Sequence, residues 1–241
     1  MQEIPLLHFN ERKAPVSLLI LHCSAHNGED MISCLNKSEV SAHYIIDLNG
    51  ELIKTVDESK RAWHAGLGSW REFTDDLNSH SIGIEISNLS LGQEAYNEQQ
   101  IQKLIPFCKK LMRKYNIKPQ NVIGHSDSAP TRKADPGIAF PWKRLAKEGI
   151  GLWYQLRNAT KIQENNVAKL LQIIGYKAET IEETIAAAYA FRRHFLPEEV
   201  CIEADVGQLV ENVYPQKNLK LLEGEKFLKT LKAVAYSFQN A

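Results

Sequence analysis

The sequence is poor in cysteine, in net charge and in long apolar runs, and each shortage excludes a class of protein. Its four cysteines, Cys23, Cys34, Cys108 and Cys201, are scattered and make no CxxC pair, so we expect free buried thiols rather than a disulfide framework or a cysteine zinc site. Lys+Arg and Asp+Glu both number 29, which leaves no general electrostatic attraction to nucleic acid. No apolar run approaches the ~20 residues of a membrane span.

The sequence also lacks a visible export signal, an internal repeat and a Pro/Gly-rich linker. Its first residues have neither the basic region nor the apolar segment of a signal peptide, which favours the cytoplasm unless a leader has been removed. The length of 241 residues, with 44% hydrophobic and 24% charged residues, suits a globular protein with one large domain, or one medium and one small domain. We expect a monomer.

The first 150 residues mix strand patterns with helix patterns. Strands are expected at 15–21, 42–47, 51–56, 81–87 and 122–124, and helices at 97–115 and 140–147. Asn49-Gly50 predicts a hairpin between the second and third strands, and Pro106 should bend the first helix. Residues 27–30 and 57–80 have the composition of loops.

Beyond residue 150 the pattern becomes all-helical. Helices are expected at 165–174, 181–195, 204–214 and 224–238, with Thr180 and Glu183 forming a capping box. We therefore divide the chain into residues 1–150 and 151–241, and expect the two parts to touch because no linker separates them.

The residues with the clearest chemical potential lie just beyond strands. His22 follows the first strand, and His125 and Asp135 lie on the loop 124–137, which prolines and glycines stiffen. Two histidines and one carboxylate from converging strand ends make a zinc site with the fourth position left for water. The spacing alone is more typical of solvated loop histidines.

Glu85 strengthens the zinc interpretation. It stands between Ile84 and Ile86, which should share the opposite face of their strand. Glu85 is then either a solvated residue of an edge strand or a carboxylate in a cleft, where it could act as a general base beside a zinc-bound water. Lys133 could stabilise an oxyanion, or could be an exposed loop lysine.

Five motifs resemble, in order, those of the zinc-dependent N-acetylmuramoyl-L-alanine amidases of the AmpD/AmiD type, the amidase-2 family. They are Leu21-His22, residues 41–58, residues 61–66, residues 78–85 and the loop 124–137, and the resemblance covers about residues 15–147. It implies an α/β (α+β) fold with a mixed central sheet flanked by helices, and cleavage of the amide between the lactyl group of N-acetylmuramic acid and L-alanine.

The resemblance also implies roles for individual residues. His22, His125 and Asp135 would bind one Zn²⁺, Glu85 would be the catalytic base, and Lys133 would meet the oxyanion. Cys23 departs from the family pattern, but consecutive strand residues face opposite ways, so we do not expect it to be a fourth ligand. The candidates for substrate contact are Trp63, His64, Asn88 and Arg132; Trp63 could equally pack beneath its loop.

The C-terminal helices resemble, more weakly, a three-helix peptidoglycan-binding domain, on the residues 167–176 and 188–195. They could equally be a packing module that shields the catalytic part. Such a domain favours the cell envelope or periplasm over the cytoplasm. The alternative functions are a non-catalytic muropeptide sensor on the same fold and a metalloprotease; the latter is disfavoured because the sequence has no His-Glu-x-x-His helix.

Overall fold

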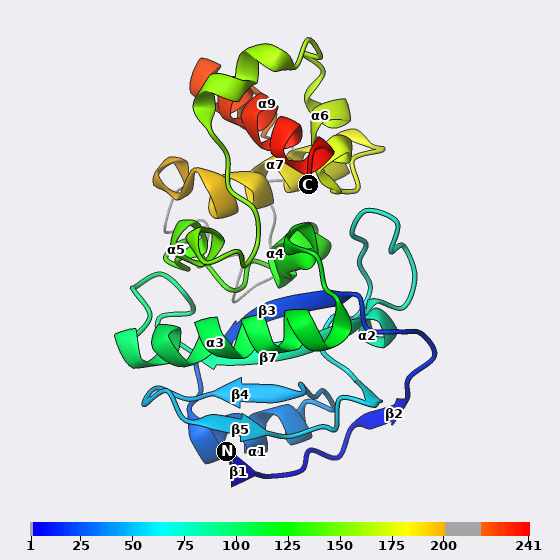
Figure 1. The fold of residues 1–241 in the computed structure, drawn as a ribbon, viewed down its shortest axis with the longest axis vertical. Coiled ribbons are helices and arrows are strands. Elements are labelled where there is room, and N and C mark those ends of the chain that lie inside the picture. The colour runs from blue at the N-terminus through cyan, green and yellow to red at the C-terminus, as the bar shows by residue number, and fades with distance from the viewer. Residues whose placement is uncertain (1, 201–217) are drawn as a thin grey trace.

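A computed structural model describes residues 2–200 and 218–241, and a mixed six-stranded sheet occupies its lower half in the view of Figure 1, below the C-terminal helices. The sheet order is β1-β5-β4-β7-β3-β8, in which only the β4–β5 pair is antiparallel, while β2 and β6 form a separate antiparallel pair. The strands are β1 (Gln2–Glu3), β2 (Phe9–Glu11), β3 (Leu18–Ser24), β4 (Tyr44–Ile46), β5 (Leu52–Lys54), β6 (Lys60–Ala62), β7 (Ser81–Ser87) and β8 (Val122–Gly124). This confirms the expected mixed sheet.

Helices surround this sheet. They are α1 (Gly28–Lys37), α2 (Leu77–His80), α3 (Glu98–Tyr115), α4 (His125–Ser128), α5 (Trp142–Lys147), α6 (Val167–Ile174), α7 (Ile181–Phe195) and α9 (Glu225–Gln239). The 3₁₀ turns are η1 (Pro119–Asn121), η2 (Leu156–Lys161), η3 (Pro197–Glu199) and η4 (Leu219–Leu222). The helix expected at 204–214 and Cys201 lie outside the described residues. No helix in the described part of the chain is long and apolar enough to cross a membrane.

Strand β3 is central because its apolar residues are buried on both faces. It lies between β7 and β8 and is parallel to both. Leu18 and Ile20 point to one face and Leu19 and Leu21 to the other, and all four are 0% exposed. The strand begins and ends three residues later than expected, so that it includes His22.

Helix α3 covers one face of the sheet. Its Leu104 and Leu111 pack with Ile82, Ile84 and Ile86 of β7 in one apolar cluster. The helix begins where the sequence predicts, with Gln100 Oε1 accepting a hydrogen bond from the Asn97 amide at 3.0 Å, and it continues through Pro106. Because the isoleucines take this face, Glu85 must point to the other one.

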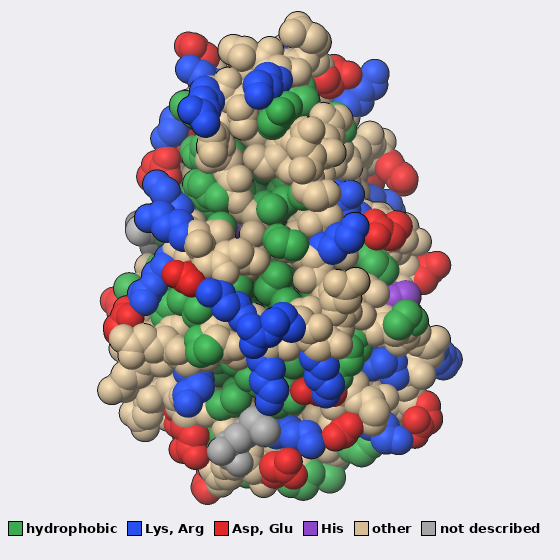
Figure 2. Space-filling view, viewed as in Figure 1, with side chains coloured by type: hydrophobic (Ala, Val, Ile, Leu, Met, Phe, Trp, Pro, Cys, Tyr) green, Lys and Arg blue, Asp and Glu red, His purple; other side chains and the backbone are tan. Residues whose placement is uncertain are grey.

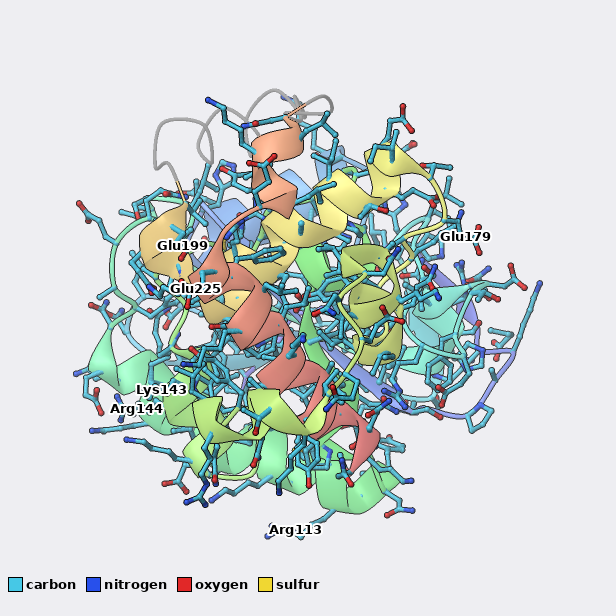
Figure 3. All side chains as sticks on the ribbon, turned by 90° about the horizontal axis from the view of Figure 1, so that it is seen from above. Arg113, Lys143, Arg144, Glu179, Glu199 and Glu225 are labelled. Carbon is cyan, nitrogen blue, oxygen red and sulfur yellow. The ribbon has the colours of Figure 1, made fainter. Side chains whose placement is uncertain are left out.

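The C-terminal helices cover the opposite face at β3 and β8, whereas α1 packs on it at β4 and β5. Leu18, Ile20 and Ile123 of the sheet belong to the same buried cluster as Leu170 of α6 and Phe191 of α7. Figure 1 shows α6, α7 and α9 together beyond β3, with α4 and α5 between them and the sheet. Phe227 of α9 and Phe191 of α7 meet edge to face at 5.7 Å, and Figure 3 views the helical part from that end. The two parts therefore share one core.

One loop prediction was wrong and a second was right only in part. Within the expected loop 27–30, Asn27 is the N-cap of α1 and the helix begins at Gly28, because Glu29 and Asp30 favour its N-terminal dipole while Met31 and Leu35 are buried one turn apart. The stretch 57–80 contains β6 and α2, which are only three and four residues long and so leave little periodicity to detect. The β4–β5 hairpin at Asn49-Gly50 is confirmed, with a positive φ of 77° at Gly50.

Basic side chains gather over α3 and α5 on the face shown in Figure 2. Two exposed ion pairs join these helices: Arg144 to Glu98 and Lys109 to Glu148, each at 2.6 Å. Such exposed pairs contribute little stability each.

Of the described cysteines, none is in a disulfide; Cys108 is buried, whereas Cys23 and Cys34 are half-buried.

Candidate metal centre and active site

Three neighbouring parallel strands bring three of the candidate residues to one level of the sheet. His22 of β3 is directly opposite Glu85 of β7, and opposite residues in neighbouring strands point to the same face. Leu21 is opposite Gly124 of β8, so His125, the next residue, comes level with His22. The order β7-β3-β8 therefore places Glu85, His22 and His125 in a row at the carboxyl edge.

Asp135 reaches this row from the loop that follows α4. Its carbonyl accepts a hydrogen bond from the Ser126 amide at 2.9 Å, which holds the loop against the helix. Farther along, Tyr96 donates its hydroxyl to the Pro136 carbonyl at 2.7 Å. Gly92 and Gly137 lie backbone to backbone, so close that a Cβ on either would meet the other at under 3 Å. These contacts fix the loop geometry that the glycines and prolines suggested.

The side chains of His22, His125 and Asp135 converge on one point. The two Nδ1 atoms lie 3.0 Å apart, and each lies 3.1 Å from Asp135 Oδ2. Tetrahedral zinc with bonds of ~2.0–2.1 Å would hold ligand atoms roughly 3.3 Å apart, close to this arrangement. Among the described residues, His22, His125 and Asp135 form the group of possible ligands that lies close enough together to hold a metal ion. Cys23 is not part of this group.

In both histidines a hydrogen bond at Nε2 fixes the ring so that Nδ1 faces the point where the three side chains converge. His125 Nε2 lies 3.0 Å from the Ala65 carbonyl, which can only accept, so Nε2 carries the hydrogen and Nδ1 the lone pair. His22 Nε2 lies 3.0 Å from His64 Nδ1. Second-layer bonds of this kind orient histidine ligands in metal sites. The residues present therefore fit a divalent ion.

His64 completes a chain of donors behind His22. With His22 Nε2–H donating to His64 Nδ1, His64 Nε2–H donates to Ser81 Oγ at 3.1 Å, and Ser81 donates to the Leu77 carbonyl at 2.6 Å. The close fit needs Gly83, because a Cβ there would lie 2.5 Å from the His64 ring. Both ring nitrogens of His64 are thus bonded to protein, and this supporting role was not foreseen from the sequence.

The electrostatics favour the ligand forms of these groups. Burial, and then the neighbouring His125, lower the pKa of His22 to about 4, so His22 is neutral at physiological pH. Burial alone would raise the pKa of Asp135, but the His125 and His22 rings beside it hold that pKa well below its usual range. Neutral imidazoles and an ionised carboxylate are the forms that bind zinc.

Glu85 has the properties of a proton-transfer group. Burial, and then the charge of Asp135, raise the pKa of Glu85 to about 8, while Lys133 acts in the opposite direction. Its Oε2 is buried and has no hydrogen-bond partner among the described residues. A carboxyl group with a pKa near neutrality can both accept and return a proton.

These residues line a pocket of about 210 Å³. Its walls include His22, His125, Asp135 and Glu85. They also include four other residues that the sequence marked as candidates: Trp63, His64, Arg132 and Lys133. Trp63 is half-buried, and its indole nitrogen donates to Asn10 Oδ1 at 3.1 Å. Arg132 donates to the carbonyls of Ala65, at 3.1 Å, and of Leu67.

Asn88 is the one candidate that the structure does not bring to this pocket. It is 5% exposed, and its Oδ1 accepts from the Ser90 amide at 3.1 Å and the Gly92 amide at 3.0 Å. Its Nδ2 donates to the Glu94 carbonyl at 3.1 Å. The side chain therefore builds the loop 88–94, and its contact with a substrate stays a prediction.

Comparison with known proteins shows the family to which this chain belongs. Residues 12–138 match the family Amidase_2, N-acetylmuramoyl-L-alanine amidase. The chain is 35% identical over 217 residues to the N-acetylmuramoyl-L-alanine amidase AmiD of Escherichia coli K12, which covers 79% of this chain and 78% of the relative. The chain belongs to this family of N-acetylmuramoyl-L-alanine amidases.

Solved structures of the family extend the likeness to the helical part. A crystal structure of AmpDh3 from Pseudomonas aeruginosa has a TM-score of 0.74 at 29% identity and covers 91% of each chain. AmiD from E. coli, in complex with anhydro-N-acetylmuramic acid-L-Ala-D-gamma-Glu-L-Lys, has a TM-score of 0.72 at 29% identity and covers 96% of this chain and 92% of that one. The fold of this chain is therefore that of its family along nearly its whole length.

Proposed function

We propose that this chain is a zinc amidase that hydrolyses the amide between the lactyl group of N-acetylmuramic acid and L-alanine in peptidoglycan or its soluble fragments. The observation that carries the proposal is the convergence of His22 Nδ1, His125 Nδ1 and Asp135 Oδ2 within 3.1 Å of one another, beside Glu85 on the same face of the sheet. The muropeptide substrate is supported by the family and by the ligand named in the AmiD complex.

A bound Zn²⁺ would polarise the scissile carbonyl and would lower the pKa of a water, so that the water can lose a proton near neutral pH and attack the carbonyl carbon. Glu85 accepts the proton that this water loses as its oxygen bonds to the carbonyl carbon. Lys133 places a positive charge beside the carbonyl oxygen as that oxygen becomes negative. Glu85 then returns the proton to the alanine nitrogen, so that the C–N bond breaks to give a lactyl carboxylate and a free amine.

The remaining pocket residues divide between substrate and support. Trp63 offers an aromatic face to the sugar, and Arg132, which also lines the pocket, can pair with a peptide carboxylate. The role of His64 is to hold His22 through its Nδ1 atom. Residues 1–150 form the catalytic part, and residues 151–241 form a helical part that resembles peptidoglycan-binding domains and favours work in the cell envelope.

The proposal can be tested by identifying which bond of the substrate is cleaved. Chelator-treated protein is incubated with a purified muropeptide, with and without added Zn²⁺, and the products are identified by mass spectrometry. We expect the intact sugar with a free lactyl carboxylate, and a stem peptide with a free alanine amine, only in the presence of the ion. A muropeptide that binds without any product would instead indicate a sensor, and cleavage within the peptide would indicate a peptidase.

A further inference from the structure

The helical part contacts the metal-site loop through one buried carboxylate. Asp127 lies in α4, two residues after His125, and is 1% exposed. Its Oδ2 accepts the Gly124 amide at 2.8 Å and His194 Nδ1–H at 2.9 Å, and its Oδ1 accepts the Tyr176 hydroxyl at 2.6 Å. Tyr176 and His194 both come from the helical part, 49 and 67 residues farther along the chain.

Both donors are held rigidly. The Tyr176 ring meets the Trp70 ring edge to face at 5.2 Å, and the preceding carbonyl, of Gly175, accepts the Arg71 amide at 2.9 Å. The His194 ring is stacked on Trp142 at 4.1 Å with an angle of 15° between the planes. Tyr176 is 3% exposed and His194 is 7% exposed, so neither side chain can leave its place without opening the core.

The protons in this cluster agree with its geometry. Burial, and then the Asp127 carboxylate, raise the pKa of Tyr176 well above its ordinary value, so its hydroxyl keeps the hydrogen that it donates. His194 donates from Nδ1, and its other ring nitrogen, Nε2, is buried and has no hydrogen-bond partner in the described part of the chain. Asp127 thus accepts three hydrogen bonds, as a buried carboxylate requires.

The cluster acts at the backbone that carries a metal-site histidine. Asp127 Oδ2 binds the amide of Gly124, the residue before His125, and so closes the first turn of α4 on itself. Gly124 is packed so closely that a Cβ there would lie 2.7 Å from Pro136, the residue after Asp135. A shift of Asp127 would therefore move His125 and Asp135 together.

We propose that Tyr176 and His194 are positioning residues of the metal centre: by clamping Asp127 they hold His125 and Asp135 in the geometry that binds the ion. The helical part then preorganises the site, in addition to any contact that it makes with the cell wall. This inference rests on the proposed function, because it requires the ion. Loss of outer partners of metal ligands typically costs about 10–100-fold in metal affinity.

The test measures Zn²⁺ affinity of the full chain by competition with a chromogenic chelator, alongside thermal unfolding of the chelated protein. Tyr176→Phe deletes one donor and keeps the ring, so we expect affinity to fall about tenfold, the lower end of that range. His194→Leu should weaken binding at least as much. His194→Asn keeps a donor near the Nδ1 position and should restore part of the loss.

The matched control is Tyr44→Phe, which deletes a tyrosine–carboxylate bond to Glu58 on the other face of the sheet. It should lower the unfolding temperature and leave Zn²⁺ affinity unchanged. Unchanged affinity in folded Tyr176→Phe and His194→Leu would overturn the inference, as would an equal loss in Tyr44→Phe. If the wild-type chain bound no Zn²⁺, the proposed function itself would fail, and the inference with it.

Discussion

Glu85→Gln should have two effects. It should stabilise the metal-free protein against unfolding, and it should abolish most of the activity of the zinc-loaded protein. An isolated glutamate loses its proton near pH 4.5, whereas burial and the charge of Asp135 raise the pKa of Glu85 to about 8. At about 1.4 kcal/mol per pH unit, this difference corresponds to roughly 5 kcal/mol of unfolding free energy for a fully dehydrated group. Because Glu85 opens partly onto the pocket, we expect about half of that.

The sign follows from proton binding. Between pH 4.5 and about 8 the folded chain keeps a proton on Glu85 that the unfolded chain has released, so folding stability falls as pH rises. Glutamine has no titrating proton, so the variant loses the part of the pH dependence of folding stability that comes from residue 85. Urea unfolding of chelator-treated wild type and Glu85→Gln should therefore give equal stabilities near pH 4.5 and diverge toward pH 8, with the variant more stable.

The same variant tests the catalytic role. Glutamine cannot accept a proton from water, so turnover of a muropeptide should fall by roughly 10²–10⁴-fold with zinc content unchanged. Parallel stability curves for the two proteins from pH 4.5 to 8 would refute the electrostatic reasoning. Full turnover by zinc-loaded Glu85→Gln would refute the role of Glu85 as base.

Four other substitutions separate the parts of the site and of the fold. Asp135→Ala should weaken Zn²⁺ binding by more than about a hundredfold, measured by chelator competition, since it removes one of three ligands; zinc bound as tightly as in wild type would exclude Asp135 as a ligand. Lys133→Ala should keep the zinc and lower kcat about 10²–10³-fold if it serves the oxyanion, and an unchanged kcat would assign it to the surface. Gly83→Ala should cost about 1–3 kcal/mol and weaken zinc binding, because its Cβ would displace His64; affinity equal to wild type would argue against that support. Leu170→Ala should lower stability by about 2–5 kcal/mol in a single unfolding transition seen by both circular dichroism and tryptophan fluorescence, whereas two transitions would contradict a core shared by sheet and helices.

Part of the candidate site could be predicted because its signals are local. In the sequence, His22 and His125 each come at the end of a short apolar run and Glu85 interrupts a run of isoleucines; these patterns locate the residues on strands or strand ends, and the family resemblance supplied their roles. The strand order could not be read in this way. It is the parallel placement of β7 and β8 on either side of β3 that turns three separate strand ends into one site.

The support behind the site was hidden from the sequence. His64 was expected to touch substrate, but its ring bonds depend on Ser81 and His22 from two other segments. Asp127 has no recognisable signal within the loop 124–137, because its partners lie far along the chain: Tyr176 just after α6 and His194 in α7. Contacts of this kind follow from how the helical part packs on the sheet, which no local pattern encodes.

The central claim is that one ion held by His22, His125 and Asp135 makes this chain an amidase. The most direct measurement is a titration of chelator-treated protein with Zn²⁺, in which bound metal and muropeptide hydrolysis are determined in the same samples. Activity should rise in proportion to bound zinc and stop at one ion per chain. Hydrolysis by the metal-free protein, or activity that does not follow the bound metal, would contradict the account.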